Sequence, residues 1–168
     1  RKIADAALAI GSILLVDEAY WLFTQDSALS LIEDYPNVVV TQTFSKALGL
    51  AGLRLGYCAG PADRIAEVEK FRGVTQSNSI ALLAADYILD HREWVLTRVA
   101  NVIAGREYLL NKFAESGLVT FTSHTNFVLL ECLSHNSAVR LIDSARASGY
   151  AIRGPLVGYP LENFVRIT

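Results

Sequence analysis

Short apolar runs alternate with amphipathic stretches along the first half of this chain. Each run has the length and β-branched content of a buried strand, and we expect strands at residues 12–16, 38–42 and 53–59. Apolar positions at helical spacing predict helices at residues 2–10 and, in a shorter form, within 26–34. This alternation predicts an α/β fold with a mainly parallel sheet that is covered by helices on both faces, in three layers.

The next expected helix starts at Gly60-Pro61, because proline is favoured at the first helical position. Its inward face is expected to carry Ile65, Val68 and Phe71, which recur at helical spacing. The charged residues of the 67–72 segment are expected to point outward.

A polar, turn-like segment at residues 73–78 interrupts this organisation. Ser79 is expected to cap a long helical region over residues 80–115 that is broken near Asp90-His91. We place a domain boundary close to Ser77. Beyond it the pattern predicts a smaller α+β unit, with a helix at 136–148 and strands at 118–122, 126–132, 150–153 and 164–168.

The turn after the second expected strand carries most of the candidate chemistry. Thr43, Ser45 and Lys46 stand together there, and Arg54 follows a glycine-rich run. A lysine amine attacks aldehydes when burial or a neighbouring cation lowers its pKa. Hydroxyls, backbone N–H groups and arginine are the usual partners of a phosphate. An imine-forming amine beside a phosphate site predicts pyridoxal phosphate as the cofactor.

An acidic group supports the same cofactor. The first expected strand runs into Asp17, and Tyr20 follows shortly after. A carboxylate at the carboxyl end of a buried strand can pair with the protonated ring nitrogen of the cofactor, and the Tyr20 hydroxyl can donate to its phenolic oxygen. Taken singly, each of these residues is more often a solvated surface residue. Their order and spacing together favour the cofactor site.

These motifs resemble the fold-type I aminotransferases, and most closely the histidinol-phosphate aminotransferase family. The resemblance rests on four stretches that occur in the order of that family, at residues 16–20, 43–57, 125–127 and 164–168. It implies that Lys46 forms the imine with pyridoxal 5'-phosphate. It also implies the other contacts: Asp17 to the ring nitrogen, Tyr20 to the phenolic oxygen, Thr43, Ser45 and Arg54 to the phosphate, and Arg166 and Arg153 to the substrate's carboxylate or phosphate.

The resemblance implies an enzyme that exchanges an amino group between a small-molecule amino donor and a 2-oxo acid. Histidinol phosphate and 2-oxoglutarate are the expected pair, in histidine biosynthesis. An aromatic amino-acid aminotransferase and a threonine-phosphate decarboxylase stay open as alternatives. So does a different class, the aminotransferase-like effector domain of a transcription regulator. A cytoplasmic homodimer is expected, with residues 1–77 ending a large cofactor-binding domain and residues 78–168 forming a connecting helix and most of a small domain.

Composition agrees with an α/β enzyme that has a sizeable core, since 52% of the residues are hydrophobic and only 19% are charged. A net charge of −2 without a Lys/Arg run gives no electrostatic basis for binding nucleic acid or an anionic membrane. The apolar stretches are too short to span a bilayer. Cys58 and Cys132 are expected as reduced thiols, and the three histidines lack metal-ligand spacing, so no metal site is expected.

We expect the sequence to be part of a longer chain. It contains no methionine, begins within a predicted helix and ends within a predicted strand. Members of the family it resembles are about twice as long, and the remainder would supply further cofactor contacts.

Overall fold

The computed structural model describes residues 1–73, 77–156, 158 and 160–168, and these divide into two compact units, Arg1–Val99 and Ala100–Thr168. The division falls within helix α5 (Arg92–Glu115). The domain boundary predicted near Ser77 lies earlier, in the segment that precedes helix α4 (Ser79–Asp90).

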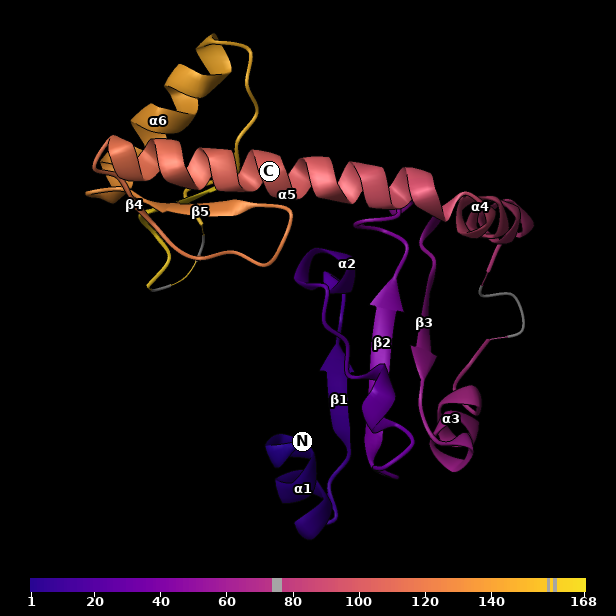
Figure 1. Cartoon of the computed structure of the whole chain (residues 1–168). Helices are drawn as coiled ribbons and strands as arrows, with labels where there is room; N and C mark the ends of the chain where they lie inside the picture. Colours follow the sequence, from indigo (N-terminus) through magenta and orange to yellow (C-terminus); the bar gives the residue numbers. More distant parts are fainter. Residues whose placement is uncertain (74–76, 157, 159) are drawn as a thin grey trace. The chain divides into compact units, whose positions relative to one another are not determined.

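The first unit is built on a three-stranded sheet with the order β1 (Leu14–Asp17), β2 (Val38–Thr43) and β3 (Gly56–Ala59) (Figure 1). Strands β1 and β2 are parallel, as predicted, whereas β3 runs antiparallel to β2, so the parallel arrangement is wrong for β3. The reason is the connection. A parallel return needs a crossover that is usually an α-helix, and the segment between β2 and β3 contains only a 3-10 turn, η2 (Ala51–Leu53).

Strand β2 is the buried centre of this sheet. Its alternate side chains Val38 and Val40 are fully buried and pack with Ala4 of helix α1 (Lys2–Ala9) and with Tyr35. Branched valine side chains suit a pleated surface that is covered on both faces. The predicted strand at residues 38–42 and helix at 2–10 are therefore confirmed.

The connecting segments depart from prediction in two places. The short helix expected within 26–34 is replaced by helix α2 (Trp21–Thr24) and a 3-10 turn, η1 (Leu29–Leu31). Helix α3 (Ala62–Glu69) forms and Ile65 is half-buried, but Val68 is 49% exposed and Phe71 is 89% exposed, so the expected inward face is wrong for these two residues. Phe71 lies beyond the end of α3, where helical spacing no longer directs its side chain.

The long helical region is confirmed, as is its interruption, because α4 ends at Asp90 and α5 begins at Arg92. Asn78, not Ser79, caps α4: its side-chain oxygen accepts a hydrogen bond of 2.7 Å from the backbone N–H of Ala81. Among the described helices, none combines the length and the apolar character needed to cross a bilayer.

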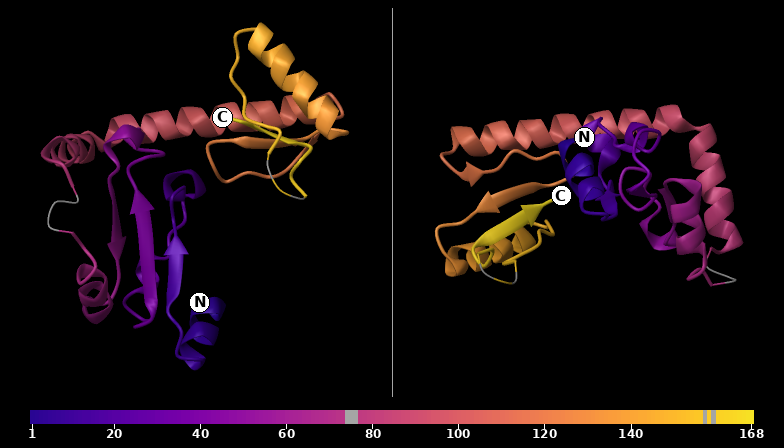
Figure 2. Two further views of the ribbon diagram at one scale, coloured as in Figure 1. Left: turned by 180° about the vertical axis from the view of Figure 1, so that it is seen from behind. Right: turned by 90° about the horizontal axis from the view of Figure 1, so that it is seen from below.

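The second unit is an antiparallel sheet with the order β4 (Val119–Thr120), β5 (Val128–Glu131) and β6 (Phe164–Ile167). Helix α6 (His135–Ala147) lies against β6 (Figure 2). Ala138, Ile142 and Val165 form a small buried cluster between them. The strand predicted at 150–153 is reduced to a single bridge, in which Arg153 pairs with Arg166. The α/β class with an α+β second unit is confirmed.

Candidate active site

The carboxyl ends of β1 and β2 deliver the first group of candidate residues to one edge of the sheet (Figure 1). The two strands are adjacent and parallel, with Asp17 opposite Thr41, so both chains leave the sheet in the same direction. This edge is where ligands bind in open parallel sheets. The Asp17 side chain is exposed, and its Oδ1 accepts a hydrogen bond of 3.1 Å from the backbone N–H of Ala19.

Hydrogen bonds within the lysine turn hold its shape. The Thr43 hydroxyl accepts from the backbone N–H of Ser45 at 3.1 Å, and the carbonyl of buried Phe44 accepts from Leu50 at 2.8 Å. The exposed Lys46 side chain lies over the ring of Tyr20, with Nζ 5.4 Å from the ring centroid. The structure thus brings the predicted amine and the predicted phenol together, although they follow different strands.

Arg54 has an unusual backbone. Its φ of 53° and ψ of 44° place it in the left-handed region, which a residue with a side chain rarely adopts. Conformations of this kind concentrate at functional sites. Its guanidinium is exposed and Nη1 donates to the carbonyl of Ala51 at 3.2 Å. At Gly56, which pairs with Thr43, an added Cβ would lie 2.9 Å from the Gln42 carbonyl oxygen, so only glycine allows this close pairing.

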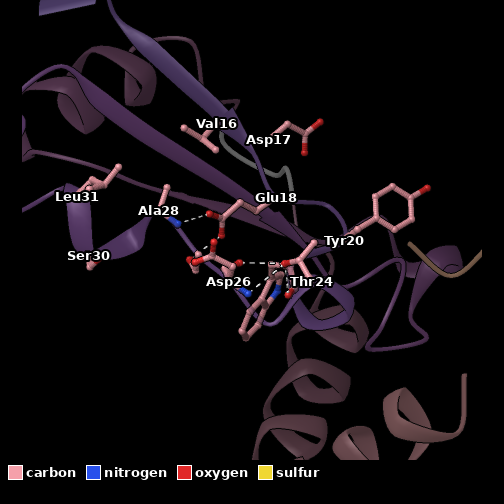
Figure 3. A pocket seen from close by; sticks show the side chains of 11 residues that line it. Val16, Asp17, Glu18, Tyr20, Thr24, Asp26, Ala28, Ser30 and Leu31 are labelled. Carbon is pink, nitrogen blue, oxygen red and sulfur yellow. Dashed lines mark hydrogen bonds between the residues drawn. The ribbon is translucent and has the colours of Figure 1, made fainter. Parts of the chain in front are cut away.

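The two acids that end β1 have different surroundings. A hollow beside β1 is lined by Asp17, Glu18, Tyr20 and parts of the 24–31 segment (Figure 3). Within it the side chains of Asp17, the last residue of β1, and Glu18, which follows it, point in different directions. Glu18 is only 9% exposed, and its carboxylate accepts hydrogen bonds from Ser27, Ala28 and Gln42.

Sequence reasoning missed Glu18 and Gln42, although alternation along β2, which places Gln42 on the same face as buried Val38 and Val40, was a signal that could have identified Gln42. The network continues to Tyr57 of β3, whose hydroxyl donates to the Gln42 side-chain oxygen. Burial, with the negative charge of Glu18 as a smaller cause, raises the pKa of Tyr57 above its usual 10.0. Tyr57 therefore stays a neutral hydrogen-bond donor at physiological pH.

The two predicted substrate arginines lie in the second unit and face each other directly. Arg153 and Arg166 exchange both backbone hydrogen bonds, at 3.0 and 2.7 Å. Residues paired in this way project their side chains from the same face of a sheet. The Arg166 guanidinium carbon lies 5.2 Å from the centroid of the Phe127 ring, and Nε is buried with no hydrogen-bond partner among the described residues. Phe127 is a contact of Arg166 that sequence reasoning did not identify.

The segment that carries Phe127 is anchored to α5. Arg106 is only 8% exposed, and its Nη1 donates to the carbonyl of Thr125 at 2.8 Å. The Thr125 hydroxyl in turn accepts from the backbone N–H of Phe127 at 3.2 Å. A buried arginine of α5 therefore positions the ring that lies against Arg166.

Comparisons with known proteins agree with these motifs. The family model for aminotransferases of class I and II matches residues 1–168. The chain is 36% identical to histidinol-phosphate aminotransferase 1 of Carboxydothermus hydrogenoformans, over 93% of this chain and 47% of that protein. It is also 36% identical to the histidinol-phosphate aminotransferase of Chlorobaculum tepidum, over 99% of this chain and 47% of that protein.

Among solved structures, the histidinol-phosphate aminotransferase of Sinorhizobium meliloti, in complex with pyridoxal-5'-phosphate, superposes with a TM-score of 0.83 at 30% identity. The match covers 99% of this chain and 47% of that chain. The chain thus spans about half the length of the curated relatives it matches. The predicted resemblance to fold-type I aminotransferases is confirmed, and this chain carries part of that fold. It belongs to the class I and II aminotransferase family.

Proposed function

We propose that this chain provides the amine, acid and phosphate-binding residues of a pyridoxal-phosphate-dependent aminotransferase. One observation carries the proposal: Lys46 Nζ lies 5.4 Å from the centroid of the ring of Tyr20, which follows the strand end that carries Asp17. An amine, a phenol and a carboxylate are the groups that an aldehyde, a phenolic oxygen and a ring nitrogen require.

The residues present fit pyridoxal 5'-phosphate. Thr43, Ser45 and the guanidinium of Arg54 offer hydroxyl and cationic donors for a phosphate, and the left-handed backbone of Arg54 supports a functional role. Asp17 offers a carboxylate that is exposed and held by a backbone N–H. When bound, the cofactor supplies an aldehyde and an electron-accepting ring.

The residues of this chain would divide the work. The Asp17 carboxylate would favour a proton on the ring nitrogen, and the Tyr20 hydroxyl would donate to the phenolic oxygen. Lys46 Nζ would hold the cofactor and, as an amine, could accept and return the proton of the amino-bearing carbon of the substrate. An incoming 2-oxo acid, with 2-oxoglutarate as the expected one, accepts the amino group.

The pairing of Arg153 with Arg166 favours a substrate that carries a phosphate. Like charges placed directly opposite on a sheet repel each other, and an anion between them offsets this repulsion. A phosphate offers more charge and more acceptor oxygens than a carboxylate does. Histidinol phosphate fits this requirement, as does threonine phosphate, whereas an aromatic amino acid offers a single carboxylate. A homodimer, a cytoplasmic location and the assignment of residues 1–77 and 78–168 to the large and small domains remain predictions.

The experiment is an assay of the full-length protein with histidinol phosphate, phenylalanine and threonine phosphate, each with 2-oxoglutarate. Turnover is expected with histidinol phosphate, and Lys46→Ala should abolish it, whereas Lys70→Ala, which removes an exposed lysine of a surface ion pair, should not. Near-normal turnover in Lys46→Ala would refute the assignment of the amine. Carbon dioxide release from threonine phosphate without amino transfer would instead identify a decarboxylase.

The arginine pair has its own test. Arg153→Ala should lower kcat/KM for histidinol phosphate by about tenfold to a hundredfold, the loss expected for a hydrogen bond to a charged group. Arg140→Ala, which removes an exposed arginine of α6, serves as the control. Equal effects of the two substitutions would contradict the phosphate assignment.

A further inference from the structure

Glu18 is a buried acid with no role in the function proposed above. Its side chain belongs to the hollow beside β1, yet its carboxylate is turned toward the protein and not toward the exposed edge where Asp17 lies (Figure 3). Three donors converge on it: the Ser27 hydroxyl at 2.7 Å, the backbone N–H of Ala28 at 2.5 Å and the side-chain amide of Gln42 at 2.7 Å. A carboxylate enclosed in this way is held in one position, because any movement breaks several hydrogen bonds at once.

The backbone of Glu18 is fixed as firmly as its side chain. Its N–H donates to the carbonyl of Thr41 on β2 at 2.8 Å, and its carbonyl accepts from Trp21 at 3.1 Å, where α2 begins. Asp17 and Tyr20 flank it within the same short segment. The position of both side chains therefore depends on how Glu18 is held.

The same network reaches the lysine turn from the other side. Gln42 links Glu18 to the hydroxyl of Tyr57 on β3. The Tyr57 ring then packs edge-on against Phe44, with 6.2 Å between the ring centroids, and Phe44 is buried two residues before Lys46. One polar network thus connects the end of β1 with the turn that follows β2.

We propose that Glu18 is a positioning residue of the proposed active site, whose carboxylate ties the end of β1 to Gln42 of β2 and to residues 27–28, and so sets Asp17 and Tyr20 against the lysine turn. This inference rests on the proposed function. Packing alone does not account for the residue, because a buried carboxylate carries a desolvation cost that an apolar side chain of similar size would avoid. Retaining the acid makes physical sense where a single arrangement of neighbouring groups is required.

The test uses the full-length protein and two spectroscopic readouts. The first is the dissociation constant of pyridoxal 5'-phosphate, and the second is the pH midpoint at which the absorbance of the bound cofactor changes. That midpoint depends on the carboxylate beside the ring nitrogen and the hydroxyl beside the phenolic oxygen, so Asp17→Asn defines the direction of shift that a displaced Asp17 would produce.

Glu18→Ala leaves buried donors without an acceptor, and we expect its dissociation constant to rise about tenfold. Its pH midpoint should shift in the direction of Asp17→Asn. Glu18→Gln keeps the shape and can still accept from Ala28 while it donates to a rotated Gln42 amide, so it should recover most of both properties. Val38→Ala removes a fully buried valine of the same sheet and destabilises the fold without touching the network.

The pattern that supports the proposal is a shifted midpoint in Glu18→Ala, recovery in Glu18→Gln and an unchanged midpoint in Val38→Ala. If Glu18→Ala does not fold, the comparison of Glu18→Gln with Gln42→Ala decides, because Gln42→Ala should give the shift and Glu18→Gln should not. A wild-type midpoint in Glu18→Ala, or the same shift in Val38→Ala, would overturn the role of Glu18 alone. Failure of the unaltered protein to bind the cofactor would overturn the proposed function as well.

Discussion

The left-handed backbone of Arg54 makes a prediction that separates stability from function. An L-residue in this region costs about 1–2 kcal/mol, because its Cβ approaches the following carbonyl oxygen. Glycine has no Cβ and avoids this cost. Its greater conformational freedom in the unfolded chain lowers the stability of the folded state by about 0.4–1 kcal/mol. Replacing Arg54 with glycine should therefore give a more stable protein than replacing it with alanine, by about 1 kcal/mol.

Cofactor binding should not follow stability in these variants. Arg54→Gly and Arg54→Ala both remove the guanidinium, which is proposed to bind the phosphate. The loss of a hydrogen bond to a charged group is worth about 1.5–3 kcal/mol, or about tenfold to a hundredfold in the dissociation constant. We expect both variants to bind pyridoxal 5'-phosphate more weakly by this factor, whichever of them is the more stable.

Urea unfolding of the cofactor-free protein and absorbance titration with the cofactor measure the two quantities separately. Gln25 is the matched control, because it has a φ of 58°, is exposed and ends helix α2 outside the proposed site. Gln25→Gly should exceed Gln25→Ala in stability by a similar amount while the cofactor affinity stays unchanged. The reasoning would be refuted if Arg54→Gly were no more stable than Arg54→Ala, or if either variant bound the cofactor as tightly as the unaltered protein.

Three further predictions follow from the described contacts. The pKa of Tyr57 is raised in the folded state, so Tyr57 contributes its full stabilisation below about pH 10 and loses it as the pH rises through the raised pKa. The free energy of unfolding, measured with urea, should therefore fall less with rising pH above about pH 10 in Tyr57→Phe than in the unaltered protein. Gly56→Ala places a Cβ 2.9 Å from the Gln42 carbonyl oxygen and should lower the free energy of unfolding by about 1–3 kcal/mol, measured by urea denaturation; an unchanged value would contradict the close approach. Arg106→Met should raise KM for the substrate held by Arg166 more than it lowers kcat, and Arg106→Lys should recover part of the loss; a change in kcat alone would argue against an indirect effect through Phe127.

Prediction from sequence succeeded where a local pattern determines structure. The apolar run ending at Val40 specifies a buried strand, and the interruption near His91 specifies two helices, whatever surrounds them. The sequence assigned Lys46 and Tyr20 to the same cofactor without predicting that they touch, and the structure places Lys46 Nζ over the Tyr20 ring because both residues follow the carboxyl ends of adjacent parallel strands. The roles of these residues toward a cofactor remain predictions.

Prediction failed where propensity and spacing within a single element do not determine the outcome. The direction of β3 is determined by the short connection that precedes it, and strand propensity carries no information on direction. Phe71 has the correct spacing for an inward face, but the helix ends before it. The pairing of Arg153 with Arg166 depends on the register of two separate segments, which no local pattern specifies.

Asp17, which ends β1, and Glu18, which follows it, show how one strand end can serve both stability and chemistry. The side chains of Asp17 and Glu18 point in different directions, and only that of Asp17 is exposed where a ligand could meet it. The exposed acid accepts a hydrogen bond from the backbone N–H of Ala19 and keeps its carboxylate accessible. The oxygens of the buried acid accept hydrogen bonds from three internal donors, and these bonds fix its position. A one-residue shift of β1 against β2 would exchange the environments of Asp17 and Glu18. The buried hydrogen bonds of Glu18 would be lost and the Asp17 carboxylate would be buried, so the proposed site depends on the register of β1 against β2.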